Sequence, residues 1–177
     1  MFLGLSGGNE NEKIVNYCYY TLFHSNYLDN YITVLPLGPS RRPISELDSS
    51  EINHLIADVM KNFKVTNHHW IVAGNSIGGL AAFNFASTRP KLFEGIFTIP
   101  EGLGANEVPE KWKNHKILLV RGELDEGDWI KLNNSTMLKL KGNVKSVEVF
   151  TIEGQGHIIS PDFDIDKVYS KYFTLNK

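Results

Sequence analysis

The sequence has a single cysteine, Cys18, in 177 residues, which excludes an internal disulfide and favours a reducing compartment. It also lacks any apolar run near the roughly 20 residues that a membrane-spanning helix needs. The amino terminus, Met1 to Gly8, is too short and too poor in charge for a signal peptide. We therefore expect a cytoplasmic protein with no membrane partner, unless a leader was removed.

An excess of charge of either sign is also lacking. The 18 basic and 20 acidic residues leave a net charge of -2 without a basic stripe, so nucleic acid is not an expected partner. His68 and His69 have no cysteine or acid at ligand spacing, which favours a structural role. The glycine-rich segments Gly102 to Gly104 and Gly74 to Gly79 lack a phosphate-loop Lys-Ser/Thr and the full dinucleotide spacing. We expect neither a metal nor a cofactor.

Short apolar runs alternate with amphipathic stretches along the whole chain, and 42% of its residues are apolar. With no linker or repeat to divide it, residues 1–177 are expected to form one α/β domain with a mainly parallel sheet. The expected strands are residues 2–5, 31–36, 69–74, 92–99, 116–121 and 144–152. Five crossover helices are expected to link them, at residues 10–25, 50–63, 76–88, 129–140 and 165–173.

A Gly-x-Ser-x-Gly segment, Gly74 to Gly78, lies directly between the third expected strand and the helix that follows it. A serine in such a sharp strand-to-helix turn has its hydroxyl raised above the sheet edge, as a nucleophile requires. Ser76 is therefore the candidate nucleophile. The alternative interpretation is an ordinary serine N-cap of the helix.

A serine hydroxyl is a poor nucleophile at neutral pH, so a nearby base such as imidazole must take its proton during the attack. The imidazole in turn needs a carboxylate that fixes its tautomer and stabilises the imidazolium. His157 lies in a glycine-rich turn after the last expected strand, which reaches the same sheet edge as Ser76. Acids follow the fifth strand, and of these Asp125 is preferred. Asp128 and Glu123 remain alternatives, and so does the interpretation that all of them are solvated charges before a helix.

Together, the segments Gly74 to Gly79, Gly122 to Asp125 and Gly156-His157 resemble the α/β-hydrolase superfamily, in particular its short esterase-like members. The resemblance covers almost the whole chain and implies a triad of Ser76, Asp125 and His157. It implies oxyanion donors at the backbone N–H of Ile77 and of Gly7 or Gly8. The family's usual histidine in that oxyanion loop is replaced by Leu5 or Ser6.

The resemblance also implies a fold without the usual N-terminal antiparallel hairpin. The segment from Pro100 to Asn114 is too short for a lid domain, which implies an open site for small or protruding acyl groups. The expected activity is cofactor-free hydrolysis of a small-molecule ester through an acyl-enzyme, and a thioesterase or small amidase would use the same residues. A catalytically silent binding protein is the alternative from another class.

One further pair of cations, Arg41 and Arg42, follows the second expected strand. They could bind an anionic substrate group at the rim of the crevice, although solvated loop charges are the favoured interpretation. The sequence predicts no oligomeric state.

Overall fold

A parallel sheet forms the centre of the computed structural model, which describes residues 1–8, 11–38, 42–65, 69–103 and 107–175. The six strands have the order β2-β1-β3-β4-β5-β6, and each neighbouring pair is parallel. They are β1 (Phe2–Leu5), β2 (Thr33–Val34), β3 (Trp70–Asn75), β4 (Phe93–Ile99), β5 (Lys116–Gly122) and β6 (Ser146–Ile152). All six expected strands are present, so the predicted fold class is confirmed.

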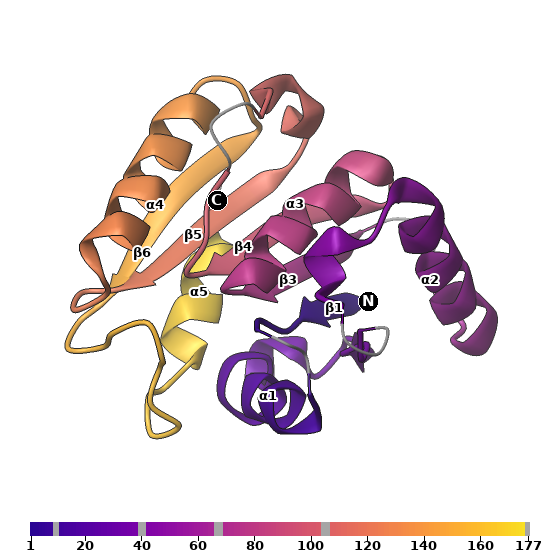
Figure 1. Cartoon of the computed structure of the whole chain (residues 1–177), viewed down its shortest axis with the longest axis horizontal. Coiled ribbons are helices and arrows are strands. Elements are labelled where there is room, and N and C mark those ends of the chain that lie inside the picture. The colour runs from indigo at the N-terminus through magenta and orange to yellow at the C-terminus, as the bar shows by residue number, and fades with distance from the viewer. Residues whose placement is uncertain (9–10, 39–41, 66–68, 104–106, 176–177) are drawn as a thin grey trace.

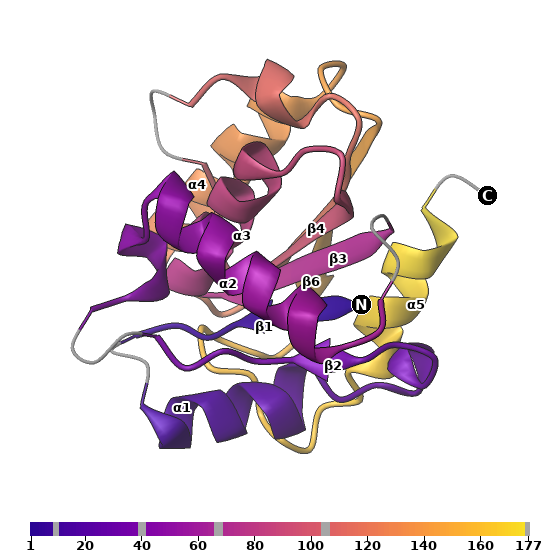
Figure 2. The same ribbon diagram turned by 90° about the vertical axis from the view of Figure 1, so that its right-hand side faces the viewer.

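Helices cover both faces of the sheet, as Figures 1 and 2 show. The α-helices are α1 (Glu12–Tyr17), α2 (Ser49–Asn62), α3 (Ile77–Thr88), α4 (Gly127–Leu140) and α5 (Asp166–Thr174). Shorter helical turns are η1 (Cys18–Leu22), η2 (Asn26–Leu28), η3 (Ile44–Glu46) and η4 (Pro109–Trp112). None of the helices in the described part of the chain is long and apolar enough to cross a membrane.

Two hydrophobic cores lie on the two faces of the sheet because successive strand side chains alternate between them. Trp70 and Val72 pack into the core beneath α2, α3 and α4. Ile71 and Ala73 pack into the core beneath α1, η1 and α5. The strand β3 between these cores is therefore buried along its whole length, and it ends directly before Ser76.

The expected five crossover helices are corrected in two places. The helix α5 follows the last strand and links no pair, and the connection between β4 and β5 contains only the short 3-10 helix η4 in the residues described. A run that contains Pro100 and Pro109 does not sustain an α-helix. The described part of this connection holds no lid domain, and an antiparallel hairpin is not among the strand pairs observed.

The first expected helix, residues 10–25, is also corrected. Residue 10 lies outside the described residues, and the α-helix ends at Tyr17, where a π-helical turn continues the chain to Leu22. The N–H of Phe23 then donates to the carbonyl of Cys18 at 2.8 Å, which closes this wide turn. Periodicity alone does not reveal such a change, because i→i+5 turns are inserted where packing requires them.

Candidate active site

The turn between β3 and α3 holds Ser76 in a strained conformation, with φ 51° and ψ -130°. A non-glycine residue at positive φ costs about 1–3 kcal/mol and persists only where its surroundings impose it. Two glycines allow the close packing around it. A Cβ at Gly78 would lie 2.3 Å from the carbonyl oxygen of Leu5, and one at Gly74 would lie 2.0 Å from the carbonyl oxygen of Gly78. The helix α3 therefore packs directly against β1 and β3.

His157 lies between the serine and a carboxylate. Its Nε2 is 3.1 Å from the Oγ of Ser76, and its Nδ1 is 3.2 Å from Oδ1 of Asp125. With the proton on Nδ1, the imidazole donates to the carboxylate and accepts from the serine hydroxyl. The structure thus brings three residues from the ends of β3, β5 and β6 into one hydrogen-bonded chain.

The side chain of Asp125 is fully buried. Its Oδ1 also accepts from the N–H of Glu126 at 2.9 Å, while its Oδ2 is buried without a hydrogen-bond partner in the described part of the chain. The competing acids lie elsewhere. Asp128 is 95% exposed beside Lys131, and Glu123 accepts from the N–H of Gly154. Of the three acids, the structure brings Asp125 to His157.

The loop after β1 approaches the serine from the other side. A Cβ at Gly7 would lie 2.9 Å from the Cβ of Ser76, and Gly8 has a φ of 64°. Ile77 is the first residue of α3, where backbone N–H groups have no partner within the helix. The three backbone positions expected to hold an oxyanion therefore surround Ser76.

A pocket of about 380 Å³ opens beside these residues. Its floor is formed by Gly7, Gly8, Asn75, Ser76 and His157. Its wall consists of Lys13, Ile14 and Tyr17 from the first helix and Ile158 from the histidine loop. The sequence did not identify this wall, because the packing of α1 against the histidine loop depends on tertiary contacts.

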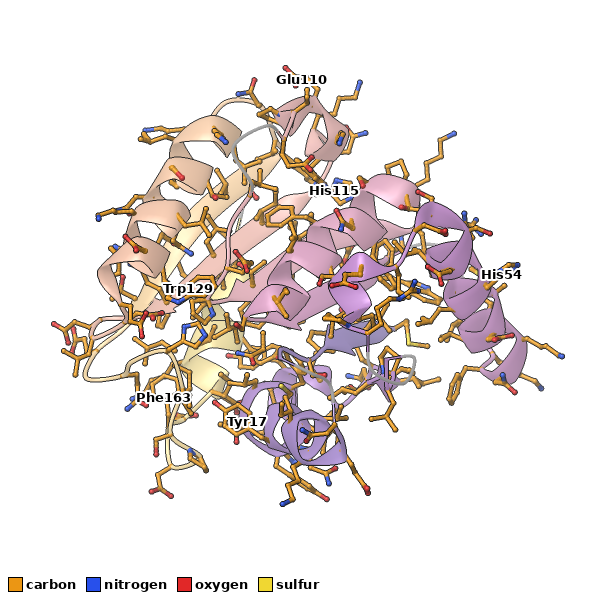
Figure 3. The ribbon with its side chains drawn as sticks, viewed as in Figure 1. Tyr17, His54, Glu110, His115, Trp129 and Phe163 are labelled. Atoms are coloured by element: carbon orange, nitrogen blue, oxygen red, sulfur yellow. The ribbon has the colours of Figure 1, made fainter. Side chains whose placement is uncertain are left out.

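Two aromatic side chains contact the loop that carries His157. The ring of Trp129, in the first turn of α4, lies 4.8 Å from the ring of His157. The hydroxyl of Tyr17 donates to the carbonyl of Ile159 and accepts from its N–H, both at 3.0 Å. Burial raises the pKa of Tyr17 to about 12, so this hydroxyl keeps its proton. Figure 3 labels both aromatic residues.

Sequence reasoning missed both of these aromatic residues. One feature of the sequence could have indicated that Trp129 lies near the site, namely its position at the start of a helix directly after the acidic segment 123–128. Tyr17 carried no signal beyond its place on the apolar face of α1.

A second buried carboxyl, Glu101, follows β4 at the same sheet edge. Burial raises its pKa to about 7, and its Oε1 accepts from the N–H of Gly102 at 2.7 Å. Its side chain packs against Gly79 in the first turn of α3. Glu101 does not line the pocket, and its contact with Gly79 supports the first turn of α3.

Of the other charged candidates, the structure describes only Arg42, which does not line the pocket. Arg42 forms an ion pair with Glu51 on α2, and Arg41 lies outside the described residues. In the part of the chain that the structure describes, no three histidine, cysteine or acidic side chains are grouped to hold a metal.

No family model and no curated protein matches the sequence. Solved structures do resemble the chain. A predicted CIB-like hydrolase from Thermoplasma acidophilum is 17% identical over 97% of this chain and 85% of its own, with a TM-score of 0.64.

Two further structures show the same likeness. A phospholipase/carboxylesterase from Dyadobacter fermentans is 16% identical over 98% of this chain and 88% of its own, with a TM-score of 0.67. The protein SOBER1 of Arabidopsis thaliana is 18% identical over 99% of this chain and 97% of its own, with a TM-score of 0.64. At such identities the likeness is one of fold, and the chain has the α/β-hydrolase fold.

Proposed function

We propose that the protein is a serine hydrolase that cleaves a carboxylic ester through an acyl-enzyme on Ser76. The observation that carries this proposal is the continuous hydrogen-bonded chain from Ser76 through His157 to the buried Asp125. The alternative interpretation, in which Ser76 is only the N-cap of α3, does not explain why a histidine and a buried carboxylate are lined up behind its hydroxyl. The backbone strain at Ser76 adds support, because strain of this kind concentrates at functional sites.

In this mechanism the Oγ of Ser76 attacks the ester carbonyl while Nε2 of His157 takes its proton. Asp125 stabilises the resulting imidazolium through Nδ1–H. The negative charge on the carbonyl oxygen is held by the N–H of Ile77 and the N–H of Gly7 or Gly8. The imidazolium then protonates the leaving alcohol. A water molecule, deprotonated by the same imidazole, attacks the acyl group and releases the acid.

The structural neighbours support an ester as the substrate, since several are described as esterases or carboxylesterases. Thioesters and small amides would be attacked by the same residues, so the leaving group is part of the test. The pocket volume of about 380 Å³ suits a small or protruding acyl group rather than a long lipid chain.

The test measures turnover of p-nitrophenyl acetate and butyrate and of matched thioesters and amides. We expect wild-type turnover of the esters and a loss of at least about 10³-fold in kcat for Ser76→Ala. Ser135→Ala is the matched control. This serine is exposed on α4 and donates to the carbonyl of Leu132, so its loss should leave turnover within about twofold.

Two results would overturn the proposal. One is full activity in Ser76→Ala. The other is a folded wild-type protein that cleaves no member of the panel, which would favour the binding-protein alternative.

A further inference from the structure

The pocket wall contains one cationic side chain, Lys13, beside apolar groups. Ile14 and Tyr17 share its helix, and Ile158 faces it from the histidine loop with 75% of its surface exposed. No acidic side chain lines the pocket in the described part of the chain. The lining is therefore suited to a ligand with an apolar body and a negative charge.

The charge of Lys13 has no evident structural role. The side chain is exposed, and no ion pair joins it to a carboxylate among the residues described. It also lies in the first turn of α1, where the helix dipole disfavours a cation. By contrast, the loop cation Arg42 is engaged with Glu51 away from the pocket.

We propose that the substrates of this site carry an anionic group, a carboxylate or a phosphate, which pairs with Lys13 while the ester carbonyl lies at Ser76. This proposal rests on the proposed hydrolase function. Ile14, Tyr17 and Ile158 would contact the apolar segment between the two polar ends of the substrate. The ammonium group would provide a charge-assisted hydrogen bond, which is stronger than a neutral one.

The anionic group could belong to the acyl part or to the leaving alcohol, and two pairs of esters distinguish these sources. The acyl pair is the mono-p-nitrophenyl ester of glutarate and p-nitrophenyl pentanoate. The alcohol pair is the acetate ester of p-hydroxybenzoate and that of p-hydroxybenzamide. In each pair, the members differ mainly in the presence of the negative charge.

We expect the wild-type protein to prefer the charged member of one pair by about tenfold in kcat/KM, and Lys13→Met to lose that preference. Met keeps the apolar stem of the side chain, so the variant should lose much more activity on the charged esters than on the neutral ones. The loss should appear in KM, because an ion pair away from the reacting carbonyl stabilises the bound ground state and the transition state equally.

Lys13→Glu should reverse the preference, and a high salt concentration should weaken it in the wild type through screening. The control is Lys61→Met, which removes an exposed lysine in the last turn of α2 that does not line the pocket. This control should keep the full preference.

The outcomes separate the two proposals. Turnover of neutral esters with no preference for a charged one, or a preference that survives in Lys13→Met, overturns the role of Lys13 and leaves the hydrolase standing. A folded wild-type protein that cleaves neither member of either pair and no member of the first panel overturns both.

Discussion

Two histidines in this molecule occupy opposite ends of the sheet and opposite environments. His157 follows β6, its side chain is 31% exposed, and both ring nitrogens have hydrogen-bonding neighbours. His115 precedes β5, is 1% exposed, and has no partner for either ring nitrogen among the residues described. Figure 3 labels His115 far from Trp129, the neighbour of His157. The same type of side chain is thus hydrogen-bonded to Ser76 and Asp125 at one end of the sheet and enclosed in the core at the other.

The difference follows from solvation and hydrogen bonding. Burial lowers the pKa of His115, because the charged form would lose its hydration and the backbone of Trp112 offsets that loss only in part. At His157 the carboxylate of Asp125 is placed to stabilise an imidazolium, and the remaining nitrogen faces the serine. The surroundings therefore make one histidine a candidate base and keep the other neutral.

The most severe test of the comparison is His157→Gln. Glutamine retains hydrogen-bonding capacity but is not a base at neutral pH, so we expect kcat for a p-nitrophenyl ester to fall by about 10⁴-fold or more. His54→Gln, at an exposed position on α2, is the control and should keep its activity. Activity within tenfold of wild type in His157→Gln would show that another group takes the proton.

Asp125→Asn should have the next largest effect. An amide favours the wrong tautomer of His157 and does not stabilise the imidazolium, so we expect kcat to fall by about 10³- to 10⁴-fold. The matched control is Asp128→Asn, three residues later, where the carboxylate is 95% exposed. If the two variants lost activity in the reverse order, the acid would be Asp128.

Trp129→Leu tests whether the aromatic ring beside His157 positions it. Loss of the ring removes a contact that orients the imidazole, so we expect kcat to fall about fivefold to tenfold with little change in KM. Trp129→Phe keeps an aromatic face and should recover most of the rate. Equal losses in both variants, or a change in KM alone, would contradict a positioning role.

His115→Leu should have the smallest effect and should act on stability. The unfolded chain binds a proton at His115 near pH 6.5, whereas the folded state resists it, so wild-type stability falls as pH drops below that value. The free energy of unfolding of the leucine variant relative to wild type should therefore rise by up to about 1 kcal/mol between pH 6.5 and pH 5.5. Urea unfolding at several pH values measures it, and a constant difference would contradict the account.

Much of the fold was predictable because strands and helices differ in apolar periodicity. The predictions were wrong at the ends of strands, where tertiary contacts determine which residues pair. The expected strand 31–36 is only Thr33–Val34, since this edge strand pairs with β1 over two positions. His69 was expected in a strand, but its φ of 66° is incompatible with one. Residue 68, beside it, lies outside the described residues.

The three candidate triad residues were predictable because each follows a strand of the expected parallel sheet. The ends of parallel strands meet at one edge, so Ser76, Asp125 and His157 could be named together before their distances were known. The sequence left Asp125 and Asp128 unresolved, because it does not show that Asp125 is buried beside His157 while Asp128 is exposed on the first turn of α4. Lys13, Tyr17 and Trp129 were missed, since their contacts arise from helices packing across the site.

Under the proposed function, Ser76 is chemically activated by its neighbours. The most direct measurement is mass spectrometry of the intact protein after exposure to a fluorophosphonate probe, with the adduct mapped by peptide sequencing. We expect one adduct, on Ser76, and we expect it to form much more slowly in His157→Gln. No adduct on the folded wild-type protein, or an adduct on another residue, would contradict it.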